Sequence, residues 1–399
     1  MKNRIQFGLA LLGALVMTSC ASDDTADINI TDNSVTNNTS TGGGTTDPGT
    51  IFLSGTYTED LDLDANSTYK INGSLIMAAG TTLRIPAGMT LEALAAGSDV
   101  YIAISAGAQI EAIGTADNPI VLTSDASAPA AGDWGGLIIL GNAPINSVSG
   151  TATATSEIAS LPYGGTDATD SSGTLRYVRV QYSGGSADGQ SENNGISFYG
   201  VGNGTDISYV QVFEGKDDGI EFFGGTVDVE FASVTGAQDD SIDWTEGYTG
   251  NITNAYVEHG TDHDKGIEAD GYNTDIGNNS NPIYFSAPTV TNLTIIGLGS
   301  GTSSEAIRLR AGTRAMLNNV VLEGYAEGID LDGNSTDNPT GAGVTSGETK
   351  ITDITFTDIT TKVQNDTGVM FTEADLISGD GNGTGTDYAT WGAGWTVGN

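Results

Sequence analysis

A short string of residues that recurs along the middle of this 399-residue chain constrains its fold more than any other feature. Each copy contains an isoleucine, usually preceded by glycine and followed by a polar residue and then an apolar one. The copies are centred on Ile196, Ile220, Ile242, Ile267, Ile307 and Ile329, at intervals of 24, 22, 25, 40 and 22 residues. The long interval predicts a loop insertion around residues 273–288. Self-similarity at such a period is typical of solenoid proteins.

A second apolar pattern repeats out of phase with the first. It consists of alternating pairs, which are Val178/Val180, Val210/Val212, Ala232/Val234, Ala255/Val257, Leu293/Ile295 and Val320/Leu322. Alternation with a period of two predicts short strands, and the Gly, Asn and Asp residues between them predict turns. Leu83-x-Ile85 recurs 19 residues later as Ile102-x-Ile104, which predicts that the solenoid starts well before Ser197.

These patterns predict an all-β fold, a parallel β-helix with coils of about 22 residues. We favour the right-handed form, because crossover connections between parallel strands are overwhelmingly right-handed. An up-and-down barrel or a sandwich would not explain why isoleucine recurs behind glycine at a nearly constant spacing.

The first residues of the chain predict a targeting segment rather than a part of the fold. Lys2 and Arg4 precede an apolar run that ends at Met17, as in a secretory signal peptide. The small residues before Cys20 make this site similar to the lipobox of bacterial lipoproteins, which implies cleavage before Cys20 and acylation of its thiol. Cys20 is the only cysteine, so the chain has no disulfide of its own and must be stabilised by packing or metal.

The residues after Cys20 predict a tether. Residues 23–50 are mostly Asp, Asn, Thr, Ser and Gly, a composition typical of flexible linkers. The acidic run that starts at Asp23 resembles the export tag of some Gram-negative lipoproteins, which implies a lipid-anchored protein of the outer membrane that faces the exterior. We predict a lipoprotein signal peptide over 1–19, a lipidated Cys20 and flexible acidic tether over 20–50, and one β-helix domain over 51–399.

Acidic residues dominate the composition. The chain has 51 Asp and Glu against 13 Lys and Arg, a formal net charge of −38. It has no basic face to neutralise phosphates, which argues against nucleic-acid binding and against attraction to an anionic lipid surface. We therefore expect contact with a membrane only through the N-terminal lipid. Hydrophobic residues make up 38 %, enough for a large core.

The alternation within strands predicts which side chains face outward. One outward column contains Ser197, Glu221, Asp243, Glu268, Arg308 and Asp330, and its neighbour contains Tyr199, Phe223, Thr245, Asp270, Arg310 and Asp332. The turns before these strands add Asp217-Asp218, Asp239-Asp240 and Asp262-His263-Asp264. Carboxylates stacked at about 4.8 Å repel one another unless a proton, a cation or an arginine compensates them.

We interpret this region as a candidate glycan site. Tyr199 and Phe223 would form an exposed aromatic platform, and the scarce basic residues would lie beyond the carboxylates. Oxygen-rich clusters of this kind suit Ca²⁺. The alternative is that Asp and Asn ladders merely satisfy turn backbone and that the arginines neutralise them. The ligand-binding candidates are Tyr199, Phe223, Lys265 and Arg310, and the metal-ligand candidates are Glu221, Asp243 and Glu268.

The run from Gly132 to Asn146, together with Tyr163-Gly164-Gly165-Thr166, resembles secreted bacterial β-helix lipoproteins of the pectate-lyase-like superfamily. These proteins have no assigned activity, and some are labelled multidrug transporters. The resemblance implies a β-helix from about Gly73 to Thr396. The transporter label does not fit this chain, because nothing after Cys20 reaches the roughly 20 apolar residues that a membrane-spanning helix needs.

Two enzymatic alternatives remain open. Asp218 and Asp239-Asp240 are similar in spacing to the aspartates of polygalacturonase-type hydrolases, which implies an acid and a base for inverting hydrolysis. The likeness is partial, since Lys216 replaces an expected Asn and the Gly-His-Gly of that family is absent. The other alternative is a Ca²⁺-assisted polysaccharide lyase, in which Arg308 or Lys265 abstracts a proton. The catalytic candidates are Asp218, Asp239, Asp240 and Arg308.

The leading hypothesis is a surface-anchored lipoprotein that binds extracellular glycan or another extracellular ligand. The alternatives are a polysaccharide lyase or glycoside hydrolase, and a structural or adhesive surface protein that partners an outer-membrane protein. Ca²⁺ is the only cofactor that the sequence suggests.

Overall fold

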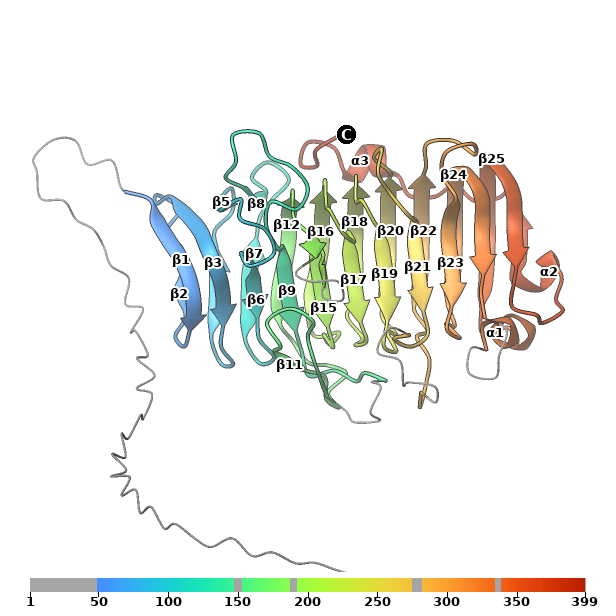
Figure 1. Cartoon of the computed structure of the whole chain (residues 1–399), viewed down its shortest axis with the longest axis horizontal. Helices are drawn as coiled ribbons and strands as arrows, with labels where there is room; N and C mark the ends of the chain where they lie inside the picture. The colour runs from blue at the N-terminus through green and yellow to red at the C-terminus, as the bar shows by residue number, and fades with distance from the viewer. Residues whose placement is uncertain (1–48, 147–152, 187–191, 275–281, 334–338, 399) are drawn as a thin grey trace, which may run out of the picture. The chain divides into compact units, whose positions relative to one another are not determined.

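The computed structural model describes residues 49–146, 153–186, 192–274, 282–333 and 339–398. Cys20, the segment 1–19 and most of the segment 20–50 lie outside these residues, so the predicted lipidation site and tether stay predictions. In the described part, 22 strands form one parallel sheet that winds into successive coils (Figure 1). The predicted class, an all-β parallel β-helix, is confirmed.

Each coil in the middle of the chain has three faces. Face A is a stack of separate short strands, whereas faces B and C are the two halves of one longer strand that bends at a corner. Face A contains β6 (Ile102–Ile104), β9 (Leu137–Leu140), β15 (Ile196–Tyr199), β17 (Ile220–Phe223), β19 (Ile242–Thr245), β21 (Ile267–Asp270), β23 (Glu305–Arg310) and the last residues of β24 (Met316–Leu331). Faces B and C are formed by β12 (Gly173–Gln181), β16 (Asp206–Phe213), β18 (Val229–Thr235), β20 (Asn251–Glu258), β22 (Thr289–Ile296), β24 and β25 (Lys350–Asn365).

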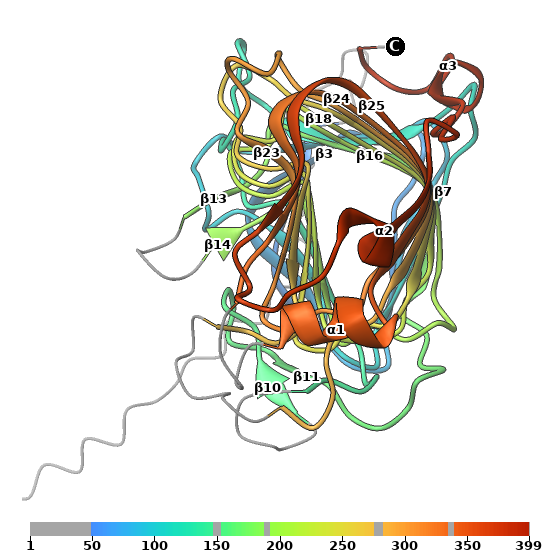
Figure 2. The ribbon, with the colours of Figure 1, turned by 90° about the vertical axis from the view of Figure 1, so that its right-hand side faces the viewer.

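The remaining elements lie at the ends and in the loops. The first coils contain β1 (Ile51–Tyr57), β2 (Leu61–Asp62), β3 (Tyr69–Met77), β4 (Thr82–Ile85), β5 (Thr90–Ala93), β7 (Gln109–Ile113) and β8 (Ile120–Ser124), and β26 (Ile377–Asp380) is the last strand. Two antiparallel pairs lie in loops, β10 (Ala154–Thr155) with β11 (Pro162–Tyr163) and β13 (Gly185–Ser186) with β14 (Glu192–Asn193). The helices α1 (Thr340–Ser346) and α2 (Glu373–Leu376) lie at the C-terminal end of the coils (Figure 2), and α3 (Tyr388–Trp391) follows. None of the helices in the described ranges is long and apolar enough to cross a membrane.

The strand register confirms both repeats. The six isoleucines pair in order from Ile196 to Ile329, and the insertion in the long interval falls between the end of β21 and the start of β22. The second pattern pairs in the same way from Val178 to Val320. The isoleucines are at most 1 % exposed, so the repeated strings line the core.

The two early strings do not stack on each other. Leu83 pairs with Ile110 in one stack, whereas Ile102 pairs with Leu75 and Leu137 on face A. Both strings end in a turn whose glycine has a positive φ, Gly88 and Gly107. Their likeness therefore reflects the same local strand and turn rather than the same place in the coil.

The glycine before the isoleucine lies where one coil passes close to the next. A Cβ on Gly219 would lie 2.5 Å from the carbonyl oxygen of Ser241 and 2.4 Å from Cγ1 of Val234. Gly195 and Gly266 make equally close approaches. Carbon atoms in a packed interior lie about 3.5–4.0 Å apart, so a side chain at these positions would force the coils apart. This close approach accounts for the glycine in the Gly-Ile copies, whereas Ser241 and Ala306 take its place in the copies at Ile242 and Ile307.

The corner between faces B and C is a left-handed turn in every coil from β12 to β25. Its seven stacked residues have φ between 50° and 61°, and they are Tyr177, Tyr209, Phe231, Asn254, Asn292, Asn319 and Asp353. Asparagine tolerates this conformation better than most residues. The three asparagines also bond to one another through their side chains, at 2.9 Å and 2.8 Å.

A C-terminal strap, residues 381–398, runs back along the outside of this corner. Thr384 donates its backbone N–H to Asn319, Tyr388 stacks on Tyr256 at 3.9 Å, and Trp395 packs edge-on against Tyr177. Val397 exchanges two hydrogen bonds with the side chain of Gln211. The strap thus connects coils from β24 back to β12, and α3 lies above the middle of the solenoid (Figure 1).

Candidate functional site

The predicted acidic column exists on the outside of face A. Its members pair in sequence from Ser197 to Asp330, one residue from each successive coil. Four of its members, Glu221, Asp243, Glu268 and Arg308, line an acidic cleft with a volume of about 990 Å³. Its described lining includes ten carboxylic acids and three basic residues. The acids are Glu157, Glu192, Asp218, Glu221, Asp239, Asp240, Asp243, Asp264, Glu268 and Asp270, and the basic residues are Lys265, Arg308 and Arg310.

Two carboxylate trios share Asp243. In one, oxygens of Asp218, Glu221 and Asp243 lie within 4.8 Å of one another, and in the other the same holds for Asp240, Asp243 and Glu268. The predicted ligand set of Glu221, Asp243 and Glu268 is therefore divided between two neighbouring clusters. Each cluster is completed by an aspartate from the preceding turn, which the sequence had suggested as an acid or base instead. Either trio could hold a divalent cation that prefers oxygen ligands.

The turn aspartates are fixed by the backbone of the next coil. Asp218 Oδ1 accepts a hydrogen bond from the N–H of Asp240 at 2.9 Å, and Asp240 Oδ1 accepts one from the N–H of Lys265 at 2.8 Å. This part of the arrangement agrees with the alternative in which turn carboxylates satisfy backbone groups. The same bonds hold the two side chains beside the column, so the structural role also positions the trios.

Burial and mutual repulsion disfavour the charged forms of these acids. Burial, followed by the charge of Glu221, raises the pKa of Asp218, and burial with the charge of Asp243 raises that of Glu221. The pKa of Asp243 is raised by burial and then by Glu268. At the cleft edge, burial and the charges of Glu192 and Asp239 raise the pKa of Asp217 to about 7. A bound cation would oppose these shifts.

These shifts predict that the chain without divalent cations becomes less stable as the pH rises. The pKa of Asp217 in the folded chain is about 7, above its ordinary value of 3.8. Its contribution to stability is therefore fully present below pH 3.8 and is lost as the pH rises through 7. In EDTA, we expect Asp217 to account for up to about 4 kcal/mol of the loss in unfolding free energy over this range. Denaturant unfolding at several pH values should show that the unfolding free energy of Asp217→Asn falls less with rising pH than that of the original chain. An equal fall in both would contradict the raised pKa of Asp217.

The three basic residues of the cleft are already paired with carboxylates. Lys265 Nζ lies 2.6 Å from Asp264 and 3.0 Å from Glu268. Burial alone would lower the pKa of Lys265, but the charges of Asp240 and Glu268, together with its bonds to Asp264 and Glu268, raise the pKa. A lysine held in its charged form is a poor proton acceptor.

Both arginines form ion pairs as well. Arg308 pairs with Asp332 and lies 3.8 Å from Asp330, and Arg310 pairs with Glu268 and Asp270. Burial is the largest single influence on the pKa of Arg308 and lowers it, but the bond to Asp332 and the charges of Asp332, Glu305 and Glu268 together raise it. These contacts do not favour the lyase alternative, in which Arg308 or Lys265 abstracts a proton.

The predicted exposed aromatic platform is wrong. Tyr199 is 1 % exposed and Phe223 is 3 % exposed, and their rings stack on each other at 4.0 Å. The segment between β9 and β12 folds back over this part of face A, and Ile145, Ile158 and Tyr163 cover the two rings in a small second core. Phe223 still borders the cleft, but it offers no open ring face to a sugar.

The aspartates suggested for inverting hydrolysis lie close together. Oxygens of Asp217, Asp218 and Asp239 are within 4.8 Å of one another. Inverting enzymes keep their two carboxyl groups about 6.5–9.5 Å apart to hold a water between them. The spacing of Asp218 and Asp239 therefore does not favour this chemistry.

The sequence pattern did not indicate three of the residues that line the acidic cleft. Glu157, Glu192 and Asn273 come from loops outside the repeat, so no spacing linked them to the column. The two histidines, in contrast, do not line the cleft. His259 packs against His263 with ring centres 4.3 Å apart, and burial lowers the pKa of His259 to about 3.

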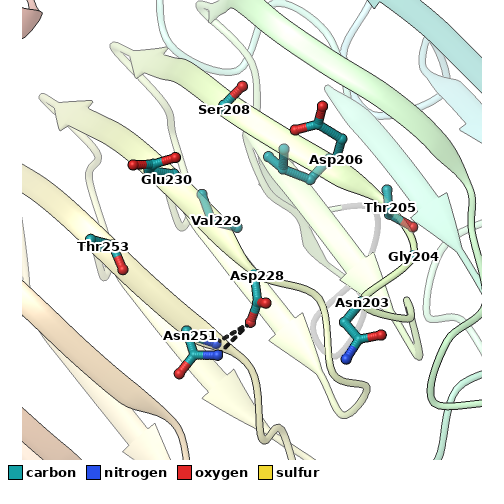
Figure 3. A pocket seen from close by; sticks show the side chains of 11 residues that line it. Asn203, Gly204, Thr205, Asp206, Ser208, Asp228, Val229, Glu230, Asn251 and Thr253 are labelled. Atoms are coloured by element: carbon teal, nitrogen blue, oxygen red, sulfur yellow. Dashed lines mark hydrogen bonds between the residues drawn. The ribbon is translucent and has the colours of Figure 1, made fainter.

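A second, smaller groove lies on the first halves of β16, β18 and β20, before the corner residues (Figure 3). Its volume is about 390 Å³, and Asp206, Asp228 and Glu230 along its length are exposed. Asp228 accepts hydrogen bonds from the backbone and the side chain of Asn251, at 2.8 Å and 2.7 Å. This groove lacks the buried carboxylates that distinguish the acidic cleft.

The fold and the cleft define a parallel β-helix protein with an acidic cleft on one face. Residues 55–396 match the family model described as pectate-lyase like beta helix domain. The chain belongs to this family. Neither the curated proteins nor the solved structures gave a match to it.

Proposed function

We propose that this chain is a surface-anchored β-helix lipoprotein that binds an extracellular glycan in the acidic cleft, with Ca²⁺ held by the cleft carboxylates. The observation that carries the proposal is the pair of carboxylate trios that share Asp243. Their oxygens are the ligands that Ca²⁺ prefers, and their mutual repulsion would be relieved by the ion. A bound Ca²⁺ would leave coordination positions for sugar hydroxyls.

The anchoring part of the proposal rests on the sequence at Cys20 and on the polar residues 23–50. Acylation at Cys20 would place the chain in the outer membrane, facing the exterior. Cys20→Ser should release the protein from membrane fractions, and a variant that still sediments with membranes would contradict lipid anchoring. An outer-membrane protein as partner belongs to the alternative of a structural or adhesive protein.

Binding is favoured over catalysis because the basic residues of the cleft are paired and its aspartates are closely spaced. One observation supports a second candidate function, a glycoside hydrolase or polysaccharide lyase. Asp217 has a pKa of about 7, near the operating pH that suits a general acid or base.

Incubation with a panel of neutral, acidic and basic polysaccharides, with and without Ca²⁺, separates these functions. We expect binding of at least one polymer, measured by calorimetry, without new reducing ends or unsaturated uronates. New reducing ends would favour a hydrolase, and unsaturation would favour a lyase. No binding and no turnover across the panel would contradict the proposal and favour the structural alternative.

A further inference from the structure

We propose that the acidic cleft selects glycans that carry ammonium groups, that is, polymers of unacetylated amino sugars, over uronate or sulfated polymers. This inference rests on the proposed function, since it assumes that the cleft is the binding site. It names the chemical class of the ligand.

The first step is that the cleft offers no free positive charge to an anionic ligand. Among the residues that line it, Lys265 and Arg310 both form ion pairs with Glu268, and Arg308 pairs with Asp332. A uronate or sulfate group would have to displace one of these carboxylates. It would also approach ten carboxylic acids, and like charges brought together in a partly desolvated site cost several kcal/mol.

The second step is that several carboxylates have no cation of their own. In the described part of the chain, no Lys, Arg or His nitrogen lies within 4.0 Å of Asp217, Asp218, Glu221, Asp239 or Asp243. One Ca²⁺ in the trio of Asp218, Glu221 and Asp243 would leave Asp217 and Asp239 uncompensated. The demand for positive charge therefore extends beyond a single ion.

The third step is an unpartnered side chain at the same place. Thr245 lines the cleft, is only 6 % exposed, and its Oγ1 has no hydrogen-bond partner. Asp243 Oδ1, two residues earlier on β19, also has none. Buried polar atoms without partners are uncommon in folded proteins, and they suit a donor supplied from outside.

The chemistry of these groups matches an ammonium group. An ammonium has three N–H donors and no acceptor, and ionised carboxylates only accept. The hydroxyl groups of the same sugar can both donate and accept, as the Thr245 hydroxyl requires. Bonds between charged donors and acceptors are about twice as strong as neutral ones, so each ammonium adds more than a hydroxyl would.

The test uses the full chain and three matched oligosaccharides. They are an oligomer of glucosamine, the same oligomer fully acetylated, and an oligogalacturonate, each measured by calorimetry with and without Ca²⁺. We expect the glucosamine oligomer to bind at least about tenfold more tightly than the other two, with affinity that falls as salt rises.

A matched pair of variants links the result to the cleft. Glu221→Gln removes one carboxylate from the trio, and Glu230→Gln removes one from the exposed groove on β16, β18 and β20. We expect only Glu221→Gln to weaken binding of the glucosamine oligomer, and a melting curve confirms that both variants fold. Equal weakening in both would overturn the inference, since it would indicate attraction by net charge alone.

Failure of the inference is distinguishable from failure of the proposed function. If the acetylated or uronate oligomer binds as well or better, and Glu221→Gln weakens it, the cleft is a glycan site but the ammonium preference is overturned. If none of the three oligomers binds, both are overturned.

Discussion

Replacing Gly219 with valine should destabilise the solenoid by about 3 kcal/mol or more, the upper range for inserting atoms into a packed core. Already the first added carbon would lie 2.5 Å from the carbonyl oxygen of Ser241, which belongs to the backbone of the next coil and cannot move alone. Denaturant unfolding should show a lower midpoint with little change in slope. An unchanged midpoint would contradict the close-approach explanation of the repeat.

Ser241→Ala is the matched control for this prediction. Ser241 holds the same place on the next coil, because Ile220 and Ile242 pair directly. Its side chain is already accommodated there, and its buried hydroxyl has no hydrogen-bond partner. We expect this change to be neutral or slightly stabilising, since an unsatisfied polar group is removed.

Asp243→Asn should weaken Ca²⁺ binding at least about 100-fold, or about 2.7 kcal/mol, because Asp243 belongs to both trios and ligand charge strongly sets affinity. Without Ca²⁺ the same variant should melt at a higher temperature than the original chain, because one of the repelling carboxylates is gone. Calorimetric titration with Ca²⁺ and melting curves in EDTA measure the two effects.

Asp206→Asn is the control for Asp243→Asn, since Asp206 is exposed in the groove on β16. It makes the same change in net charge and should alter neither quantity. Equal effects in both variants would mean that the ion is attracted by the overall charge of the chain rather than bound by the trios.

The repeat made the fold and the acidic column predictable from the sequence. A period of two within strands and about 22 between coils determines which side chains stack, so the order from Ser197 to Asp330 followed without any structure. The sequence pattern of the two early strings did not show which face of the coil each string occupies. Leu83 and Ile102 begin similar strand and turn units, but these units lie on different faces.

The parts of the site that were missed depend on non-repeating segments. Tyr199 and Phe223 occupy outward positions, as the alternation predicts, but Ile158 and Tyr163 from a distant loop cover them. The alternation specifies the direction of a side chain and carries no information about what folds over it. For the same reason the sequence did not indicate that Glu157 and Glu192 line the cleft. Lys265 and Glu268, which pair with each other, both lie within the repeat.

The strap changes the mechanics of the whole array. In a simple solenoid each coil contacts only its neighbours, so the ends can fray one coil at a time. Here the last residues return to the middle, where Gly398 lies beside Phe213 and Thr235. A force applied at the C-terminus would therefore act across the flank of the coils and unzip the Trp395 and Tyr388 contacts before it stretched any strand stack. A fusion partner or fluorophore added there would report on the centre of the array rather than on its tip.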